Sequence, residues 1–297
     1  MSKVHIFGGT GFVGAHLKQQ LSQNHLVTCS GSEINIADQQ ELDALLRKIQ
    51  PDFVVNLAAI STLKESVEDP VGTYRINFLG VLNILMSLKK NNFLGKFLFV
   101  SSSEVYGLLS DSDLPVSEDH PLRPQSPYAV AKIASEALCY QWSKLENFSI
   151  IVARPFNHIG PGQSPRFAVA DFARQISSIK KGSQNPEIYV GDIDTTRDFT
   201  DVRDIVNAYE LLLNFGKSGE IYNVCSGYEI SIRELIVKMG EMAKIKIKIC
   251  SDPTRLRKSD QRRVHGDAKK LISATGWAKR FTIDETLMDI LQSQPNL

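Results

Sequence analysis

A glycine triplet placed directly after a short apolar strand constrains the fold of this chain more than any other feature. Residues 3–7 predict a strand, and the helix that follows runs to about Gln23. Gly8, Gly11 and Gly14 lie between the two, in a GxxGxxG spacing. Glycine lets the backbone turn tightly and approach a pyrophosphate, and the start of a helix offers free N–H groups to that anion. The triplet therefore predicts a dinucleotide site between the first strand and the first helix.

Strands and helices then alternate about every 25 residues, which is typical of βαβ units. The predicted strands lie at residues 26–29, 53–59, 96–100, 150–154 and 221–224, and the predicted helices end near Ile49, begin at Asn77 and run from Arg166 to Lys181. This alternation predicts an α/β fold, a Rossmann-type doubly wound parallel sheet with a smaller α/β C-terminal substrate domain. We expect residues 1–155 and about 200–225 to form the NAD(P)-binding domain, and about 156–199 with 226–297 to form the second domain.

A tyrosine and a lysine stand four residues apart in the stretch that opens with Ser126-Pro127. On a helix, Tyr128 and Lys132 project from one face. A nearby ammonium favours the phenolate, so we expect Lys132 to lower the pKa of Tyr128 toward working pH. The phenol could then exchange a proton with a carbonyl or alcohol oxygen, held in place by Ser102 or Ser103 at the end of the preceding strand. The same spacing occurs on ordinary surface helices, and here the order of motifs along the chain favours chemistry.

The end of the second predicted strand bears on the choice of dinucleotide. NAD-selective sites usually place an acidic residue there to bind the ribose diol, whereas this strand ends in Ser30-Gly31-Ser32, and Glu33 follows late. Without that carboxylate, a 2′-phosphate meets less repulsion, and Ser30 or Ser32 could hydrogen-bond it. We therefore expect NADP(H) in preference to NAD(H).

Composition excludes several classes of protein. The net charge of +1 gives no overall attraction to nucleic acid, and the basic run at 255–263 has no interleaved aromatic residues. The four cysteines lie far apart and the six histidines form no metal-binding array, so we expect reduced thiols and no metal site. No apolar run approaches the roughly 18 residues that span a bilayer. The first residues form a strand with no signal peptide, and we expect a cytoplasmic protein.

Six motifs together resemble the extended short-chain dehydrogenase/reductase family, whose members act mostly on nucleotide sugars. They are GGTGFVG, NLAAIS, SSSEVYG, SPYAVAK, RPFNHIGPGQ and RDFTDVRD, and they cover nearly the whole chain. The resemblance implies that Ser102, Tyr128 and Lys132 are catalytic. It also implies a homodimer, because family members commonly pair through two helices, one of which carries the Tyr-Lys pair.

The resemblance also places the cofactor residues. The family's adenine-pocket Asp falls on Asn35, followed by Ile36, which leaves adenine contact to an amide. Small residues at the end of the third strand leave room for a flat ligand. The expected cofactor-binding residues are Gly8, Gly11, Phe12, Val13, Gly14, Ser30, Asn35, Ile36, Leu57, Ala58, Ala59, Tyr128 and Lys132.

A nucleotide-sugar substrate is expected at the same sheet edge. Asn157 resembles the family asparagine that contacts the sugar and phosphates, and Arg197 is suited to a diphosphate because guanidinium binds phosphate oxygens in bidentate fashion. The run RLRKSDQRR resembles an element that holds the nucleotide of GDP-sugars, with Arg257 on phosphate or ribose and Asp260 on a ribose hydroxyl. Ser103 completes the expected substrate residues, which are Ser103, Asn157, Arg197, Arg257 and Asp260. His158, despite its chemistry, is expected to be structural.

Within the family, the motifs are most similar to reductases of GDP-4-keto-6-deoxy-D-mannose. The resemblance implies NAD(P)H-dependent reduction of the C4 ketone to give GDP-D-rhamnose. Glu104 leaves an alternative open, because related 4,6-dehydratases carry a glutamate there that removes a proton from C5. A GDP-mannose 4,6-dehydratase, or another nucleotide-sugar dehydratase or epimerase, is therefore the second reading. A non-enzymatic NAD(P)-sensing regulator is the third, although such proteins usually lose the Tyr or the Lys.

Overall fold

Six parallel strands form the central sheet, in the order β2-β1-β3-β4-β5-β9. The computed structural model describes residues 1–255 and 261–294. The strands are β1 (Lys3–Phe7), β2 (Leu26–Ser30), β3 (Phe53–Asn56), β4 (Lys96–Val100), β5 (Ser149–Pro155) and β9 (Ile221–Val224). β1 pairs in parallel with β2 on one side and with β3 on the other. The order in which successive strands are added to the sheet therefore changes side between β1 and β3. Ligands bind outside the carboxyl ends of the strands at such a switch point.

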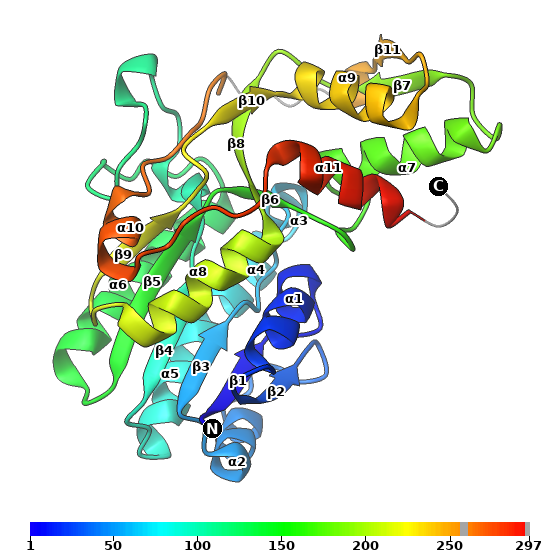
Figure 1. Cartoon of the computed structure of the whole chain (residues 1–297). Helices are drawn as coiled ribbons and strands as arrows, with labels where there is room; N and C mark the ends of the chain where they lie inside the picture. Colours follow the sequence, from blue (N-terminus) through cyan, green and yellow to red (C-terminus); the bar gives the residue numbers. More distant parts are fainter. Residues whose placement is uncertain (256–260, 295–297) are drawn as a thin grey trace.

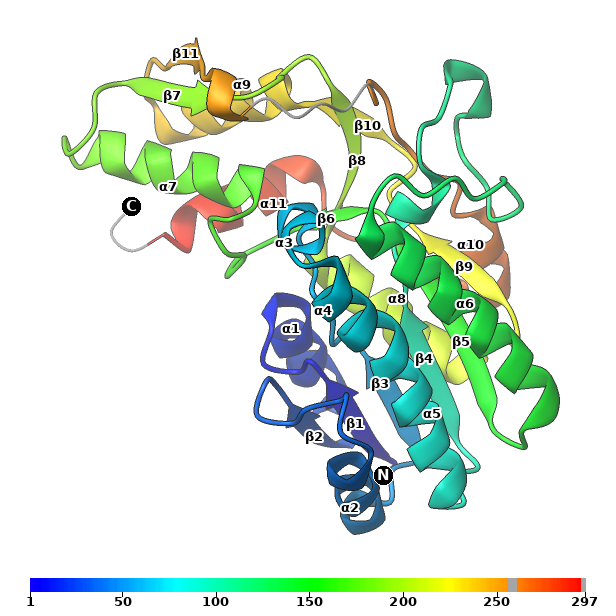
Figure 2. The same cartoon turned by 180° about the vertical axis from the view of Figure 1, so that it is seen from behind.

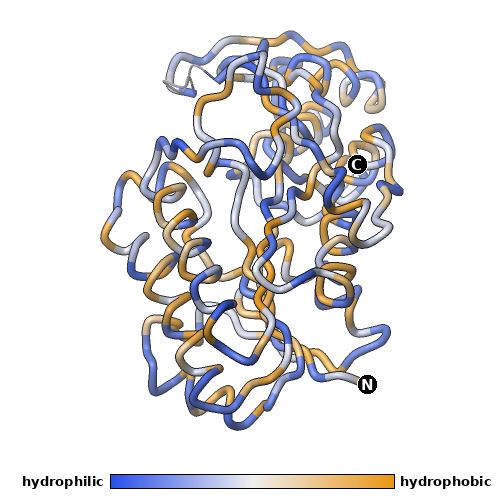
Figure 3. Tube along the Cα trace, turned by 90° about the vertical axis from the view of Figure 1, so that its left-hand side faces the viewer, coloured by the Kyte–Doolittle hydropathy of each residue, from blue (hydrophilic) through white to orange (hydrophobic). Residues whose placement is uncertain are grey.

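Helices cover both faces of this sheet, as the doubly wound prediction requires (Figures 1 and 2). One face carries α1 (Phe12–Leu21), α8 (Val202–Phe215) and α10 (Lys269–Thr275), and the other carries α2 (Gln39–Ile49), α5 (Gly80–Lys90) and α6 (Pro127–Leu145). Leu17, Leu21 and Tyr209 pack with the strands on the first face, and Leu42, Ile84 and Cys139 on the second. Figure 3 shows these apolar stretches running through the middle of the molecule. The predicted α/β class is confirmed.

Two small sheets and three helices lie at the carboxyl edge of the large sheet, shown at the top of Figure 1. They comprise β6 (Asn157–Ile159), β8 (Thr196–Asp201), β10 (Glu229–Ser231), β7 (Glu187–Val190), β11 (Lys248–Ser251), α7 (Ala168–Lys180), α9 (Ile232–Ala243) and α11 (Ile283–Gln292). The strands form two small sheets, β10-β8-β6 and β11-β7, and a separate apolar cluster joins them to the three helices. The remaining short elements are α3 (Leu63–Glu68), α4 (Pro70–Tyr74), η1 (Arg75–Leu79), η2 (Ser103–Tyr106), η3 (Asp111–Asp113) and η4 (Pro253–Arg255).

Two details of this upper part differ from the sequence-based expectation. The segment after β5 was expected to be a loop because of its prolines and glycines, but residues 157–159 form β6 and pair with β8 in parallel. In addition, α10 comes from the stretch assigned to the second domain, yet it packs against α8 and β9 of the large sheet. Leu271 and Trp277 are buried there, which explains why this short segment returns to the first apolar cluster.

Side-chain caps fix several helix starts. Asp38 accepts hydrogen bonds from Gln40 and Glu41 at the start of α2, and Ser126 accepts one from Ala129 at the start of α6. Two capping boxes are also present, Ser231 with Glu234 opening α9 and Thr282 with Glu285 opening α11.

A continuous helical run from Pro70 to Lys90 combines α4, the π-turn η1 and α5. This helical run is long and apolar enough to cross a membrane by length and hydropathy alone. No apolar run of that length was expected from the sequence. Val81, Ile84 and Leu88 are buried against the sheet, however, and 44% of the apolar window is buried inside the protein. The apolar residues of α5 in this run therefore belong to the core of the protein.

Candidate active site

The glycine triplet forms a backbone cradle at the switch point between β1 and β3. Gly8 has a φ of +76°, and a Cβ there would lie 2.7 Å from the backbone nitrogen of Ala58. A Cβ on Gly14 would lie 2.5 Å from the carbonyl oxygen of Gly8, so only glycine lets α1 start this close to the loop. Gly11 caps α1 without any side-chain hydrogen bond, which leaves N–H groups of the first turn available to an anion. This cradle fits the pyrophosphate of a dinucleotide.

The side chain of Asn56, at the end of β3, supports the same placement. Its amide oxygen accepts a 3.1 Å hydrogen bond from the backbone of Ala58, whereas its amide nitrogen is buried with no partner among the residues that the structure describes. A buried donor without a partner is costly, and its presence beside the cradle is consistent with a polar ligand. Leu57, Ala58 and Ala59 are half-buried at this strand end, where the sequence placed them.

The adenosine end of the expected site is arranged differently from the prediction. The hydroxyl of Ser30 is buried and lies 3.2 Å from Nε2 of His5, so it does not face outward toward a 2′-phosphate. The exposed carboxylate of Glu33 instead accepts a 2.7 Å hydrogen bond from the backbone of Gly31, and this bond lowers the pKa of Glu33. The expected role of Ser30 overlooked His5, a buried neighbour on β1 that takes up its hydroxyl.

Asn35 and Ile36 follow on the same side. Asn35 is exposed, and its side-chain oxygen accepts a 3.0 Å hydrogen bond from the backbone of Ala37. Ile36 is buried against Gly80 of the following helix. Their contact with an adenine ring stays a prediction.

Tyr128, Lys132 and Ser102 meet at the carboxyl end of β4. Tyr128 and Lys132 lie in the first turns of α6, and both are buried, with 9% and 3% of their surfaces exposed. The side chain of Ser102 lies near the Tyr128 phenol and lowers its pKa, and Ser102 also caps the short helix η2 by accepting a hydrogen bond from the backbone of Glu104. Lys132 donates a 2.7 Å hydrogen bond to the carbonyl oxygen of Val100, and its nitrogen lies 5.7 Å from the centre of the Tyr128 ring. The structure thus brings the three predicted catalytic residues together.

The expected effect of Lys132 on the Tyr128 phenol is wrong for the protein itself. The pKa of Tyr128 is raised to about 12, chiefly by burial; Ser102 lowers it, and the carboxylate of Glu104 makes a smaller contribution that raises it. Burial also lowers the pKa of Lys132 to about 8. The reason is that the Lys132 ammonium is aimed at Val100, whereas the phenolate would lose its hydration in this buried position. Tyr128 is therefore a protonated phenol at neutral pH, which suits a proton donor.

Sequence reasoning missed a buried polar network behind these residues. Glu136, one turn beyond Lys132, is bonded to Arg154 of β5 through 2.9 Å and 2.6 Å contacts and accepts a 2.5 Å hydrogen bond from Ser101. Arg154 also donates to the hydroxyl of Tyr106 over 3.0 Å. The helical spacing of Tyr128, Lys132 and Glu136 was visible in the sequence, but their partners on other elements were not.

Asn77, expected only as the start of a helix, holds the loop after β3. Its side-chain oxygen accepts a 2.8 Å hydrogen bond from the backbone of Ile60, and its side-chain nitrogen donates over 3.0 Å to the same residue. The backbone oxygen of Asn77 accepts a 2.8 Å hydrogen bond from Ser135 of α6. Asn77 lies in η1, and π-turns are frequent at functional sites because they alter backbone pairing.

The expected substrate residues lie on the small sheet above this centre. Asn157 is exposed on β6, and Arg197 is half-buried on the neighbouring β8. The Arg197 guanidinium donates to the carbonyl oxygens of Thr196 and Gln261, over 2.7 Å and 3.1 Å. Arg197 thus contacts the backbone of Gln261, where the described chain resumes. Arg257 and Asp260 lie outside the described residues, and Ser103 is half-buried beside Ser102.

His158 connects the glycine loop to this small sheet. Its Nδ1 donates a 2.9 Å hydrogen bond to the carbonyl oxygen of Phe156, and burial lowers its pKa, so the ring is neutral. The ring stacks on Phe12 at the start of α1, with centroids 6.3 Å apart. Nearby, His16 of α1 contacts the carbonyl oxygen of Pro161 over 2.9 Å. These contacts fit the structural role expected for His158.

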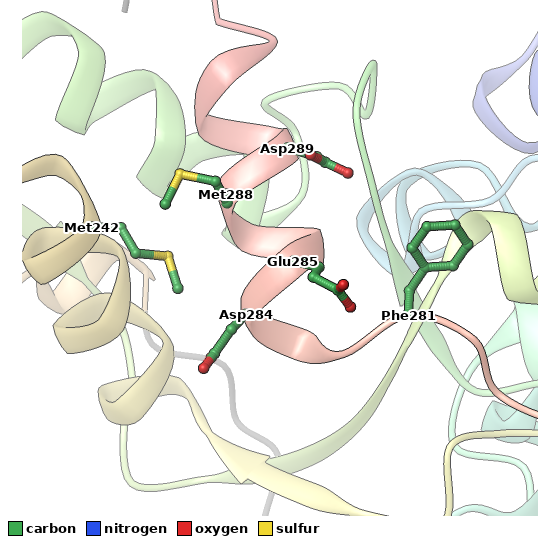
Figure 4. A pocket seen from close by; sticks show the side chains of 6 residues that line it. All are labelled: Met242, Phe281, Asp284, Glu285, Met288 and Asp289. Carbon is green, nitrogen blue, oxygen red and sulfur yellow. The ribbon is translucent and has the colours of Figure 1, made fainter.

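Two other features of the described residues carry no chemistry of this kind. Among residues 1–255 and 261–294, no three His, Cys, Asp or Glu side chains gather as a metal ion would require. A hollow of about 440 Å³ is lined by residues of α9, α11 and the segment before α11, and by none of the predicted site residues. Figure 4 shows the side chains that line it. The lining residues are Met242, Phe281, Asp284, Glu285, Met288 and Asp289.

Known proteins are similar to this chain in sequence and in fold. Residues 30–290 match the protein family described as GDP-mannose 4,6 dehydratase. The GDP-6-deoxy-D-mannose reductase of Pseudomonas aeruginosa is 44% identical over 291 residues, which cover 97% of this chain and 96% of that protein. The solved structure of RMD from Pseudomonas aeruginosa complexed with NADPH superposes with a TM-score of 0.94 at 41% identity, covering 99% of this chain and 98% of the other. The UDP-glucose 4-epimerase of Thermus thermophilus, solved with NAD, is 26% identical with a TM-score of 0.86, over 98% of both chains.

Proposed function

Because the chain belongs to the GDP-mannose 4,6 dehydratase family, within the extended short-chain dehydrogenases/reductases, we propose that it reduces the C4 ketone of GDP-4-keto-6-deoxy-D-mannose with NADPH to give GDP-D-rhamnose. The observation that carries this proposal is the buried, protonated Tyr128, with Ser102 beside its phenol and Lys132 one turn along the same helix. Similarity to a reductase of the corresponding GDP-sugar over nearly the whole chain supports the substrate, and similarity to an NADPH complex supports the cofactor.

The mechanism follows from what the side chains can do. Bound NADPH supplies the hydride. Tyr128 and Ser102 donate hydrogen bonds to the ketone oxygen, where negative charge develops, and Tyr128 then gives its proton to that oxygen. Lys132 contributes positive charge behind the phenol, and its buried position keeps this charge effective. Preorganised donors of this kind act because they need no reorientation when the charge appears.

The nucleotide half of the substrate is assigned to the small upper sheet. We infer that Arg197 binds a phosphate oxygen and that Asn157 bonds the sugar or phosphate, because both lie on adjacent strands at the carboxyl edge of the large sheet. Ser103 lies next to the ketone-binding hydroxyl of Ser102 and is placed toward the sugar.

A dehydratase is the second candidate, and Glu104 favours it. The carboxylate of Glu104 is exposed and close enough to Tyr128 to raise the pKa of its phenol. A base in that position could remove a proton next to the ketone carbon. The dehydratase would act on GDP-mannose and leave the cofactor unchanged overall, whereas the reductase consumes one NADPH for each ketone.

Assays of the purified protein with each of the two substrates distinguish the reductase from the dehydratase. With GDP-4-keto-6-deoxy-D-mannose, we expect stoichiometric loss of NADPH absorbance and a product whose proton NMR couplings at C4 match GDP-D-rhamnose. GDP-mannose alone should stay unchanged. Conversion of GDP-mannose to a 4-ketosugar without NADPH loss would identify the dehydratase, and a product with the talose configuration would correct the stereochemistry.

We also propose that the protein is a homodimer. Apolar side chains are exposed along α4, α5 and α6, which Figure 2 shows next to each other, and along η1, which joins α4 to α5. They are Val71, Leu79, Met86, Val130 and Tyr140. A second copy of the chain could bury this face, which a soluble monomer would leave in water. Sedimentation should give twice the chain mass, and the substitution Tyr140→Arg should lower it.

A cytoplasmic location is proposed on separate grounds. The four cysteines, Cys29, Cys139, Cys225 and Cys250, are all free thiols. Reduced, unpaired cysteines are typical of proteins in reducing compartments. Fractionation of the producing cells would test this location.

A further inference from the structure

The side chain of Glu136 lies on the same face of α6 as the two reactive groups. Tyr128, Lys132 and Glu136 follow each other at four-residue intervals, and all three are buried. Glu136 lies one turn beyond Lys132 along α6, and the mechanism above gives it no contact with substrate or cofactor. A buried carboxylate without a chemical role needs another explanation, because burial of charge is unfavourable unless it is fully compensated.

Compensation for this charge is complete. One carboxylate oxygen of Glu136 accepts from Ser101 over 2.5 Å and from Nε of Arg154 over 2.9 Å, and the other accepts from Nη2 of Arg154 over 2.6 Å. Arg154 in turn donates to the hydroxyl of Tyr106 and to the backbone oxygen of Glu118, over 3.0 Å and 3.1 Å. The network therefore joins α6 to the ends of β4 and β5 and to η2.

These contacts enclose the segment that carries Ser102. Ser101, immediately before it, is bonded to Glu136. Tyr106, at the end of η2, is bonded to Arg154 and donates a 2.6 Å hydrogen bond to Asn223 of β9. Ser102 lies between these two anchors as the cap of η2. Its hydroxyl is thus held from the same helix that positions Tyr128.

We propose that the Glu136–Arg154 ion pair is a positioning device that keeps Ser102 in register with Tyr128 and Lys132. Buried ion pairs contribute little net stability compared with apolar side chains of similar volume, so stability alone does not explain the pair at this position. Positional accuracy does, since small misplacements of catalytic donors cost large factors in rate. The inference rests on the proposed reductase function, although its structural part can be tested without it.

The test compares two variants with wild type and a matched control. Glu136→Gln keeps the shape but removes the charge, and the double variant E136L/R154M replaces the pair with apolar side chains. We expect the first to lower kcat about 10- to 100-fold, with less than about a 3-fold change in KM for the ketosugar and in NADPH affinity. The double variant should unfold at the same urea midpoint as the wild type, whereas its kcat should stay below that of the wild type.

Asp43→Asn is the matched control. Asp43 is also buried and accepts from a serine hydroxyl and a cation, Ser87 over 2.6 Å and Lys90 over 2.6 Å, but it joins α2 to α5 outside the site. This variant should lower the urea midpoint and leave kcat unchanged. Recovery of kcat together with the midpoint in E136L/R154M would overturn the proposal, because the pair would then be only structural.

A crystal structure of E136L/R154M gives a readout that does not depend on activity. We expect Ser102 to move away from the Tyr128 phenol, with α6 itself in place. An unchanged Ser102 would contradict the inference. A wild-type protein that turns over no ketosugar would contradict the proposed function instead, and the crystal structure would still decide whether the pair positions Ser102.

Discussion

Lys132 donates a 2.7 Å hydrogen bond to the carbonyl oxygen of Val100, the last residue of β4. This contact fixes the ammonium at the carboxyl edge of the sheet, 4.9 Å from the centre of the Phe99 ring. The charged group faces Tyr128, Glu136 and Cys139 of its own helix and Val100 of β4. The bond therefore places a buried positive charge behind the phenol at the cost of its hydration.

Replacing Lys132 should separate stability from activity. Burial lowers the pKa of Lys132 from 10.5 to about 8, so below about pH 8 the folded chain carries the whole cost of a buried ammonium. Between about pH 8 and 10.5 the unfolded chain binds more protons than the folded one, and stability gained from this group rises with pH. Lys132→Met should therefore raise the free energy of unfolding at pH 7 by about 1–3 kcal/mol, with reductase activity lost.

Urea unfolding at pH 7 and again near pH 10.5 measures this effect, and the difference between variant and wild type should shrink at the higher pH. The exposed Lys64 provides the control, since Lys64→Met removes a charge that is already hydrated. A Lys132→Met protein less stable than wild type at neutral pH would contradict the account of the buried ammonium.

Two glycines of the cradle should respond differently to an added methyl group. In Gly14→Ala, the new Cβ would meet backbone atoms of Gly8 and Gly9 at 2.5–2.7 Å, and backbone cannot move aside cheaply. We expect the free energy of unfolding to fall by about 1–3 kcal/mol and the affinity for NADPH to fall as well. In Gly11→Ala, the one close contact is at 3.3 Å, so stability should hold while affinity falls. Urea unfolding and fluorescence titration with NADPH measure both, and equal affinities for all three proteins would disprove the cradle.

Glu33 should influence the choice of cofactor. Its exposed carboxylate is charged at neutral pH, and the hydrogen bond from Gly31 lowers its pKa below the ordinary value. It lies just past the end of β2, the strand end at which dinucleotide sites place an acidic residue for the adenosine ribose. A 2′-phosphate nearby would be repelled. Glu33→Gln should raise the ratio of kcat/KM for NADPH over NADH about 5-fold, as expected for one exposed charge. Glu241→Gln, on α9, should leave the ratio unchanged, and an unchanged ratio in Glu33→Gln would place the ribose elsewhere.

The sequence was informative wherever a pattern is local. The glycine triplet, the apolar strands and the spacing of Tyr128 and Lys132 predicted the sheet and the reactive pair, because strand and helix periodicity reside in consecutive residues. β6 was missed because three residues between prolines and glycines show no such period. Its partner β8 lies about 40 residues further along the chain, and only the folded protein shows the pairing.

Burial and long-range contacts account for the other differences. The pKa of Tyr128 was expected to fall because sequence reasoning counted its neighbour Lys132, whereas desolvation by the folded protein raises it. Ser30 was assigned to a 2′-phosphate without knowledge that His5 takes up its hydroxyl. Arg154 could not be linked to Glu136 from the sequence, because their contact depends on how α6 packs against β5.

The most direct measurement is turnover of GDP-4-keto-6-deoxy-D-mannose with NADPH by the wild-type protein and by Tyr128→Phe. The account predicts substrate-dependent NADPH oxidation by the wild type and a kcat lower by about 10²–10⁴-fold in the variant, with NADPH binding retained. Undiminished turnover without the phenol hydroxyl would contradict proton donation by Tyr128, and with it the proposed mechanism.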